Sequence, residues 1–480
     1  MNIKRLYRTV KLEHLILLLI MVLAYYLTFI PHQSYPYPVH LDEWLALGSS
    51  EALLAKGSFT VGAGRFLEAG FHLFWGIFYQ ISGISWLHIF RYFPGIVFII
   101  TILSVYILAR REGFGWEAAL FTSLIPTTVG ILGPAFLVPL TIALPFIPLA
   151  LFLAFNVRTV GSYVVLFIFI SFLLLTHSVT AVGLVIVLAP YILFNLKSNF
   201  KHSLGIMLAL GIPFLAPFPW IFNLLLPTAK SLFSPQPIRD YVQIPRIIKT
   251  YGYLPVLFAI LGTFLLALRG GKKNYSLILG LLALIVMLAI FFTLHYGNPD
   301  MYYRGLMYMM LMLGIVAGAG LMGVRNLRLP ARLVTWLRAP LIKENLGYIL
   351  CLALIGLTLA IAIPAHQKTP YYHMIDEQDY QAFVWIRDTV DENYQKAILD
   401  PWKGIPFNAI TQRGVYSAIK GYPKPSDEEA YEFLRDGCRD TDFLREKGIS
   451  IIYTREQCDN LNLVAVGEGI YLLKETEGSE

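Results

Sequence analysis

Two adjacent carboxylates, Asp42 and Glu43, follow His40 a few residues after the first long apolar run of the chain. A charge held close to hydrocarbon is costly, and such acids mark functional sites. An outward-facing carboxylate there could act as a general base that takes a proton from an attacking hydroxyl. The alternative is structural: Asp42 would cap a helix whose dipole suits the charge. Because a cap requires neither two acids nor a neighbouring histidine, we interpret Asp42 and Glu43 as the catalytic candidates and His40 as a substrate-binding neighbour.

A second candidate, Arg304, stands at the start of a late apolar run, directly after Tyr303. A guanidinium matches phosphate oxygens and keeps its charge at every physiological pH, so Arg304 could clamp a phosphate. An arginine at the end of a span can also extend to the lipid headgroups without any further role. Tyr303 is included as a substrate-binding candidate beside it.

Four further candidates surround these groups in the sequence: Arg65, Glu68, His72 and Arg91. Glu68 and His72 are four residues apart and would share one face of a helix. A divalent metal held by Glu43, Glu68 or His72 is one interpretation, although their spacing matches no known metal signature. The alternative is a surface salt bridge between Glu68 and His72.

The next candidate, His177, lies in the predicted turn between two spans. Arg91 lies near the outer end of another predicted span. Either side chain could line a cavity. Core packing or headgroup contacts would explain both residues equally well.

The composition places these residues in a membrane protein. The chain of 480 residues is 56% hydrophobic and only 14% charged, whereas a soluble domain carries about 25% charged residues. The net charge of +7 comes from Lys and Arg beside apolar runs, which is typical of topology signals and argues against a nucleic-acid partner. The first run has no small-residue cleavage site and predicts a retained span.

Apolar runs of roughly 17 to 25 residues predict about eleven transmembrane helices. They cover residues 15–31, 88–109, 116–132, 136–155, two runs either side of 176–178, 204–226, 254–268, 277–294, 303–322 and 346–364. With a cytoplasmic N-terminus, the loops on that side carry most of the Lys and Arg, as the positive-inside rule requires. The first external loop (residues 32–87), with predicted helices at 42–55 and 66–81, and the C-terminal tail then lie outside the cell membrane.

The tail differs sharply from the rest of the chain. Residues 1–364 form the predicted membrane domain, and 365–480 a small α/β domain with helices at 376–393, 427–435 (capped by Ser426) and 442–447. Strands are predicted at 397–399, 414–416, 449–453 and 470–473. Cys438 and Cys458 would form a disulfide in an oxidising compartment, with two buried thiols as the alternative. Residues 400–403 and Arg413 read as a turn region, or as groups that reach a substrate.

One span, a long external segment opened by adjacent acids, many further spans and an external α/β tail together resemble the GT-C superfamily of membrane glycosyltransferases. Protein O-mannosyltransferases, aminoarabinose transferases and oligosaccharyltransferases belong to that superfamily. Asp42-Glu43 is similar to the acidic pair in the first external loop of those enzymes. The likeness in organisation extends over the whole chain.

The resemblance implies an inverting transfer of a hexose or pentose from a polyprenyl-phosphate donor to an acceptor hydroxyl at the outer face of an archaeal or bacterial membrane. Asp42 would be the base, Glu43 its support, and Arg304 the counter-ion of the lipid phosphate. The acceptor is a lipid, a glycan or a protein, and no nucleotide is required. A transporter or flippase of a lipid-linked sugar is the alternative, although it predicts ionisable residues in mid-bilayer.

One departure bears on metal dependence. Oligosaccharyltransferases bind a divalent metal with further acids from the second external loop. In this chain no Asp or Glu occurs from Ala118 through Arg239. Transfer of a single sugar to a hydroxyl, without a required cofactor, therefore fits better than metal-dependent amide glycosylation.

Overall fold

A computed structural model describes residues 12–57, 68–215, 230, 234, 244–327, 340–420 and 423–474. The chain divides into two compact units. The helical unit comprises residues 1–33, 64–71 and 92–370, and the α/β unit comprises residues 34–63, 72–91 and 371–480. Arg65 lies outside the described residues.

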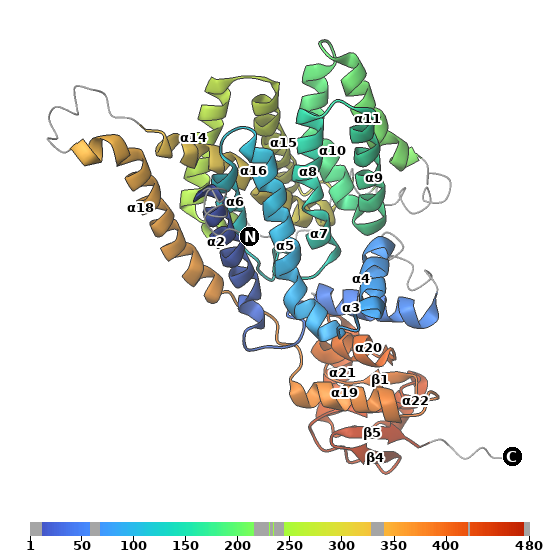
Figure 1. Cartoon of the computed structure of the whole chain (residues 1–480). Coiled ribbons are helices and arrows are strands. Elements are labelled where there is room, and N and C mark those ends of the chain that lie inside the picture. The colour runs from blue at the N-terminus through green and yellow to red at the C-terminus, as the bar shows by residue number, and fades with distance from the viewer. Residues whose placement is uncertain are drawn as a thin grey trace, which may run out of the picture. The chain divides into compact units, whose positions relative to one another are not determined.

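Long apolar helices make up the helical unit (Figure 1). Within the described ranges, seven candidate spans are long and apolar enough to cross a membrane, and three shorter apolar helices accompany them. The helices that contain these segments are α2 (Leu12–Phe29), α5 (Trp86–Arg110), α7 (Pro139–Ala143) with α8 (Phe146–Asn156), α9 (Val160–Thr176), α10 (Ser178–Asn195), α11 (Phe200–Leu215), α14 (Tyr253–Arg269), α15 (Lys272–Leu294), α16 (Pro299–Arg325) and α18 (Pro340–Gln367). The prediction of a polytopic helical membrane protein is confirmed.

The predicted span at 116–132 is not one helix. Helix α6 (Gly115–Ser123) has nine residues, and the chain from Leu124 to Val138 is not helical. Pro126 and Pro134 lack the N–H that a helix needs and disfavour the helical conformation of the residue before them. Non-helical backbone is tolerated in a membrane protein where protein covers it. This segment is largely buried, with Phe136 at 0% exposure.

Glycines allow α16 to pack closely against α6 and α14. A Cβ added at Gly318 would overlap Ala118 of α6, and one at Gly320 would overlap the carbonyl oxygen of Phe258 in α14. Small residues at helix interfaces are the usual route to close packing in membranes. Gly314 and Gly323 also face neighbouring side chains at close range.

Charged residues near the ends of several helices of the helical unit are joined in pairs. Glu13 lies 3.4 Å from Arg110, and Glu112 lies 3.5 Å from Lys273. Glu117 is fully buried against Arg325. Because a buried carboxylate is tolerated only when paired, this pair holds α6 to α16.

The α/β unit is built on a five-stranded sheet of order β2-β1-β3-β5-β4. Its strands are β1 (Lys396–Ile398), β2 (Gly414–Val415), β3 (Ile451–Tyr453), β4 (Leu463–Gly467) and β5 (Ile470–Leu473). The β1 strand is parallel to β2 and β3, whereas β5 is antiparallel to β3 and β4. Side chains alternate between the faces of each strand, so both faces of this sheet can be covered by helices.

Four helices cover the sheet: α19 (Glu377–Thr389), α20 (Gly404–Thr411), α21 (Pro425–Arg435) and α22 (Thr441–Glu446). Ile398 and Ile452 pack in one core with Phe433 of α21 and Leu444 of α22. On the other face, the ring of Phe383 in α19 lies 5.1 Å from that of Phe407 in α20, and 5.1 Å from that of Tyr453. Figure 1 labels these four helices and the strands β1, β4 and β5.

The four predicted tail strands and three predicted tail helices are present, but α20 and β4 are absent from the prediction. Ser426 does not cap α21, because the helix begins at Pro425 and Lys424 occupies the cap position. Cys438 and Cys458 are joined in a disulfide, as predicted for an oxidising compartment, and the free Cys351 is buried.

Helices α3 (Leu41–Lys56) and α4 (Ala69–Ser82) match the helices predicted in the first loop within a few residues. Helix α3 packs against α20, and a Cβ added at Gly48 would stand 2.9 Å from the Cα of Ala409. The helix that bears the acidic pair therefore packs directly on the sheet-containing part of its unit.

Candidate functional site

The first turn of α3 carries the acidic pair. His40, not Asp42, occupies the N-cap position, and its Nδ1 accepts a hydrogen bond from the backbone N–H of Asp42 at 3.1 Å. The alternative in which Asp42 caps this helix is therefore wrong. Asp42 is the second residue of the helix and is partly exposed.

Glu43 has a different environment. Its side chain is fully buried, and Oε2 accepts a hydrogen bond from the backbone N–H of Val39 at 3.0 Å. This bond satisfies a backbone donor just before the helix, much as the glutamate of a capping box does. Glu43 thus fixes the turn on which Asp42 stands.

His72 is buried, so the interpretation that places it at the surface in a salt bridge with Glu68 is wrong about the surface. The Nδ1 atom of His72 lies 2.8 Å from the hydroxyl of Ser50. This hydrogen bond joins α4 to α3, and a Cβ added at Gly76 would stand 3.0 Å from the side chain of Leu54. His72 therefore helps to set the position of the acidic helix.

A contact between distant segments precedes the acidic turn. The rings of Tyr35 and His373 stack at 4.1 Å, and the Tyr35 hydroxyl donates to the carbonyl of Ile375 at 2.8 Å. The hydroxyl of Tyr37 donates to Glu377 at 2.6 Å. The residues that lead into α3 are thus fixed to those that lead into α19. Sequence reasoning missed this contact, and the tyrosines of 35–37 and 371–372 were its only signal.

In the helical unit, His177 ends α9 and begins α10. Its Nδ1 lies 2.7 Å from the hydroxyl of Thr180, which in turn lies 2.7 Å from the hydroxyl of Tyr308. Burial, and secondarily the positive charge of Arg304, lower the pKa of His177 well below its usual value. His177 is therefore neutral at physiological pH, and the fold brings it within electrostatic range of Arg304.

Arg304 is partly buried on the first turns of α16, one turn before Tyr308. The neighbouring Tyr302 is buried, with its ring 4.7 Å from that of Phe291, whereas Tyr303 is partly exposed. These contacts set the orientation of the helix end that carries Arg304. Sequence reasoning missed Tyr308, because a buried tyrosine in an apolar span has no distinguishing pattern.

The start of α4 packs on the end of α9. A Cβ added at Gly70 would stand 2.7 Å from the hydroxyl of Thr176. Glu68, two residues earlier, therefore belongs to the same end of the helical unit as His177. Arg91 is partly buried near the start of α5, within the α/β unit.

Two groups that the sequence left open have structural roles. Arg413 is buried and donates to the backbone carbonyls of Val390, Asp391 and Tyr394. Asp400 caps a short 3-10 helix, Pro401–Lys403, by accepting from the N–H of Trp402 at 3.0 Å. The turn interpretation of this segment is confirmed.

Among the described residues, no three His, Cys, Asp or Glu side chains converge as a metal site. The Glu43 carboxylate accepts from Val39, and His72 already has Ser50 as a partner. Because the described residues offer no such group of three donors, we assign no step to a metal.

No protein-family model and no curated protein sequence matches the chain. Its structure, however, is similar to that of the oligosaccharyltransferase AglB of Archaeoglobus fulgidus, solved with an inhibitory peptide and a dolichol-phosphate. The TM-score is 0.63 at 13% identity, over 92% of this chain and 69% of that one.

The structure is also similar to ArnT from Cupriavidus metallidurans bound to undecaprenyl phosphate, with a TM-score of 0.57 at 13% identity, over 96% of this chain and 97% of that one. This chain shares its fold with these two proteins. A further structure of the Archaeoglobus enzyme, in complex with Zn and sulfate, has a TM-score of 0.58 at 14% identity, over 91% of this chain and 67% of that one. At these identities the likeness concerns the fold alone.

Proposed function

We propose that the chain is a glycosyltransferase that moves a single sugar from a polyprenyl-phosphate donor to an acceptor hydroxyl. The observation that carries the proposal is the GT-C fold, over nearly the full length of a transferase solved with undecaprenyl phosphate. The acidic turn at the start of α3, immediately after the first span, supports it.

In the proposed reaction, Asp42 takes the proton of the acceptor hydroxyl while the oxygen of that hydroxyl attacks the anomeric carbon. The bond from that carbon to the phosphate oxygen breaks, and polyprenyl phosphate leaves with the bonding electrons. Attack opposite to the leaving group inverts the configuration. A partly exposed carboxylate is accessible to an acceptor hydroxyl and suits a general base.

Arg304 is the proposed partner of the donor phosphate. A guanidinium balances the charge that develops on the leaving group, and such stabilisation acts mainly in the transition state. The neutral state of His177 leaves Arg304 as the cation of that cluster. A metal is not required by this assignment.

The proposed topology has the N-terminus in the cytoplasm and the α/β unit outside. The disulfide between Cys438 and Cys458 supports this orientation, because such bonds persist in oxidising compartments. A membrane-impermeant maleimide should label Asp442→Cys in right-side-out vesicles and Asn199→Cys only in inverted ones. Labelling of Asn199→Cys from outside would contradict the orientation.

The transferase itself is tested with purified full-length protein and undecaprenyl-phosphate or dolichyl-phosphate donors carrying labelled mannose or aminoarabinose. We expect label to leave the lipid, and Asp42→Asn to slow this by about 10² to 10⁴. Asp442→Asn, an exposed aspartate on α22, is the matched control. Equal turnover in Asp42→Asn and wild type removes Asp42 from the mechanism. Movement of intact donor across the bilayer without cleavage would favour a flippase.

A further inference from the structure

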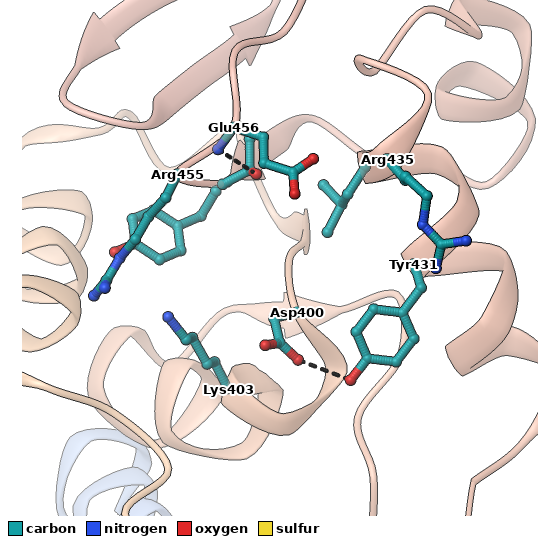
Figure 2. Close-up of a pocket in the computed structure, with 9 residues that line it drawn as sticks. Asp400, Lys403, Tyr431, Arg435, Arg455 and Glu456 are labelled. Atoms are coloured by element: carbon teal, nitrogen blue, oxygen red, sulfur yellow. Dashed lines mark hydrogen bonds between the residues drawn. The ribbon is translucent and has the colours of Figure 1, made fainter.

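A hollow in the α/β unit is lined by nine residues that the proposed reaction does not use, and all of them except Leu434 have polar or charged side chains (Figure 2). Asp400 and Lys403 come from the 3-10 turn, Tyr431 and Arg435 from α21, and Arg455 and Glu456 from the segment after β3. Its volume is about 360 Å³, within the range of small-molecule sites.

One wall of the hollow is fixed before any ligand arrives. Oδ1 of Asp400 accepts from the N–H of Trp402 and from the hydroxyl of Tyr431, both at 3.0 Å. Its Oδ2 has no hydrogen-bond partner among the residues that the structure describes, so it remains an acceptor on a rigid support. Figure 2 shows the Tyr431 ring beside this carboxylate.

The opposite wall is fixed by a buried carboxylate outside the hollow. Asp379, at 1% exposure, binds Lys403 at 2.7 Å, the hydroxyl of Tyr453 at 2.7 Å and Arg455 at 2.9 Å. Asp376 binds Arg455 as well, at 2.5 Å. Two of the three cations around the hollow are therefore already neutralised.

This charge balance selects the class of ligand. The cations Lys403, Arg435 and Arg455 face four carboxylates, those of Asp376, Asp379, Asp400 and Glu456. An anion would gain little here, because two of these three cations, Lys403 and Arg455, already have ion-pair partners. Fixed carboxylate acceptors, guanidinium donors and a tyrosine ring instead match a ligand rich in hydroxyl groups, which both donate and accept.

A second hollow, of about 250 Å³, shares the segment Tyr453–Glu456 with the first and includes Gln378, Glu468 and Tyr471. Two polar hollows with a common wall suit a chain of hydroxylated units better than one small molecule. We propose that these hollows bind a neutral oligosaccharide. The role of that glycan as the acceptor rests on the proposed function, whereas its binding does not.

The binding test uses full-length protein in lipid nanodiscs free of glycoside detergents. Saturation-transfer NMR would measure binding of methyl glucoside, mannoside and galactoside and of maltose. We expect at least one of these neutral probes to bind. Tyr431→Phe and Arg435→Gln should each weaken it about tenfold, equivalent to about 1.4 kcal/mol. Arg445→Gln, an exposed arginine of α22 outside the hollow, should bind as wild type does.

Three results would overturn the proposal: no probe binds, the Tyr431 and Arg435 variants bind with wild-type affinity, or inorganic phosphate displaces the glycoside. Donor cleavage separates this proposal from the transferase. If Asp42→Asn cleaves donor normally while the hollow variants lose glycoside binding, the transferase fails and the oligosaccharide site stands. If Asp42→Asn loses cleavage and the hollow variants bind glycoside normally, the reverse holds.

Discussion

The carboxylate of Glu43 accepts a hydrogen bond from the backbone N–H of Val39, 3.0 Å away, inside a fully buried environment. Its neighbour Asp42 is partly exposed on the next position of the same helical turn. Adjacent acids of the same chemical type therefore have different tasks: one supports the turn, and the other is available for the proposed chemistry.

Replacing Glu43 separates these tasks. Glu43→Ala leaves a buried N–H without its acceptor, which should lower the free energy of unfolding by about 1–3 kcal/mol. Glu43→Gln keeps an oxygen for Val39 and should lose less. Thermal melts followed by circular dichroism would measure both. An alanine variant as stable as the glutamine variant would contradict the supporting role.

Arg304 should act on the donor rather than on the acceptor. We expect Arg304→Gln to reduce kcat/KM for the polyprenyl-phosphate donor by about 10² or more, because a positive charge near a leaving phosphate stabilises the transition state. Arg304→Lys keeps the charge but not the two-pronged geometry, and should be intermediate. Initial rates over a range of donor concentrations would measure this. Equal rates for Arg304→Gln and wild type would show that the arginine only contacts headgroups.

The buried carboxylate of Asp379 should be important for the stability of the α/β unit. Asp379→Ala leaves Lys403 without its buried partner, a change that costs about 3–5 kcal/mol. Asp388→Asn is the control, since Asp388 forms an exposed pair with Arg387, and such pairs contribute about 0–1 kcal/mol. Denaturant unfolding followed by tryptophan fluorescence would compare them. Similar midpoints for the two variants would contradict the prediction.

The stability of the same unit should depend on the protonation of Glu51 in α3. Burial raises the pKa of Glu51 above its ordinary value of 4.5, and the charge of Arg387 opposes the shift in part. Ionised Glu51 lowers the free energy of unfolding, and this loss is absent below pH 4.5 and complete above the raised pKa. Glu51→Gln should therefore raise the melting temperature at pH 7, by about 2 °C, with the gain vanishing as the pH falls below the ordinary value. Glu432→Gln, on the exposed face of α21, should show no such pH-dependent gain.

Close packing of α14 on α16 should tolerate no side chain at Gly262. An added Cβ there would overlap the carbonyl oxygen of Val316, and overpacking a tight helix contact costs about 1–3 kcal/mol. Gly262→Ala should lower the melting temperature of the protein in nanodiscs. Gly356→Ala in α18 meets nothing within 4 Å and should leave it unchanged. A melting temperature equal to wild type in Gly262→Ala would show that the helices can separate at low cost.

The sequence by itself determined the membrane character, most of the helices and the four predicted strands of the tail. Each of these depends on local hydrophobic length and period, which a single segment carries without its neighbours. It also singled out Asp42 and Glu43, because two adjacent acids close to hydrocarbon are costly, and Arg304, because a guanidinium suits a phosphate.

Only the tertiary structure decided which acid supports the turn, because the N–H that Glu43 satisfies and the burial around it depend on the folded chain. The same holds for the broken segment at 124–138, whose backbone is stable outside a helix only because other residues cover it. The hollow around Asp400 and Arg455 joins residues from three separate segments. Long-range contacts of this kind leave no periodic trace in the sequence.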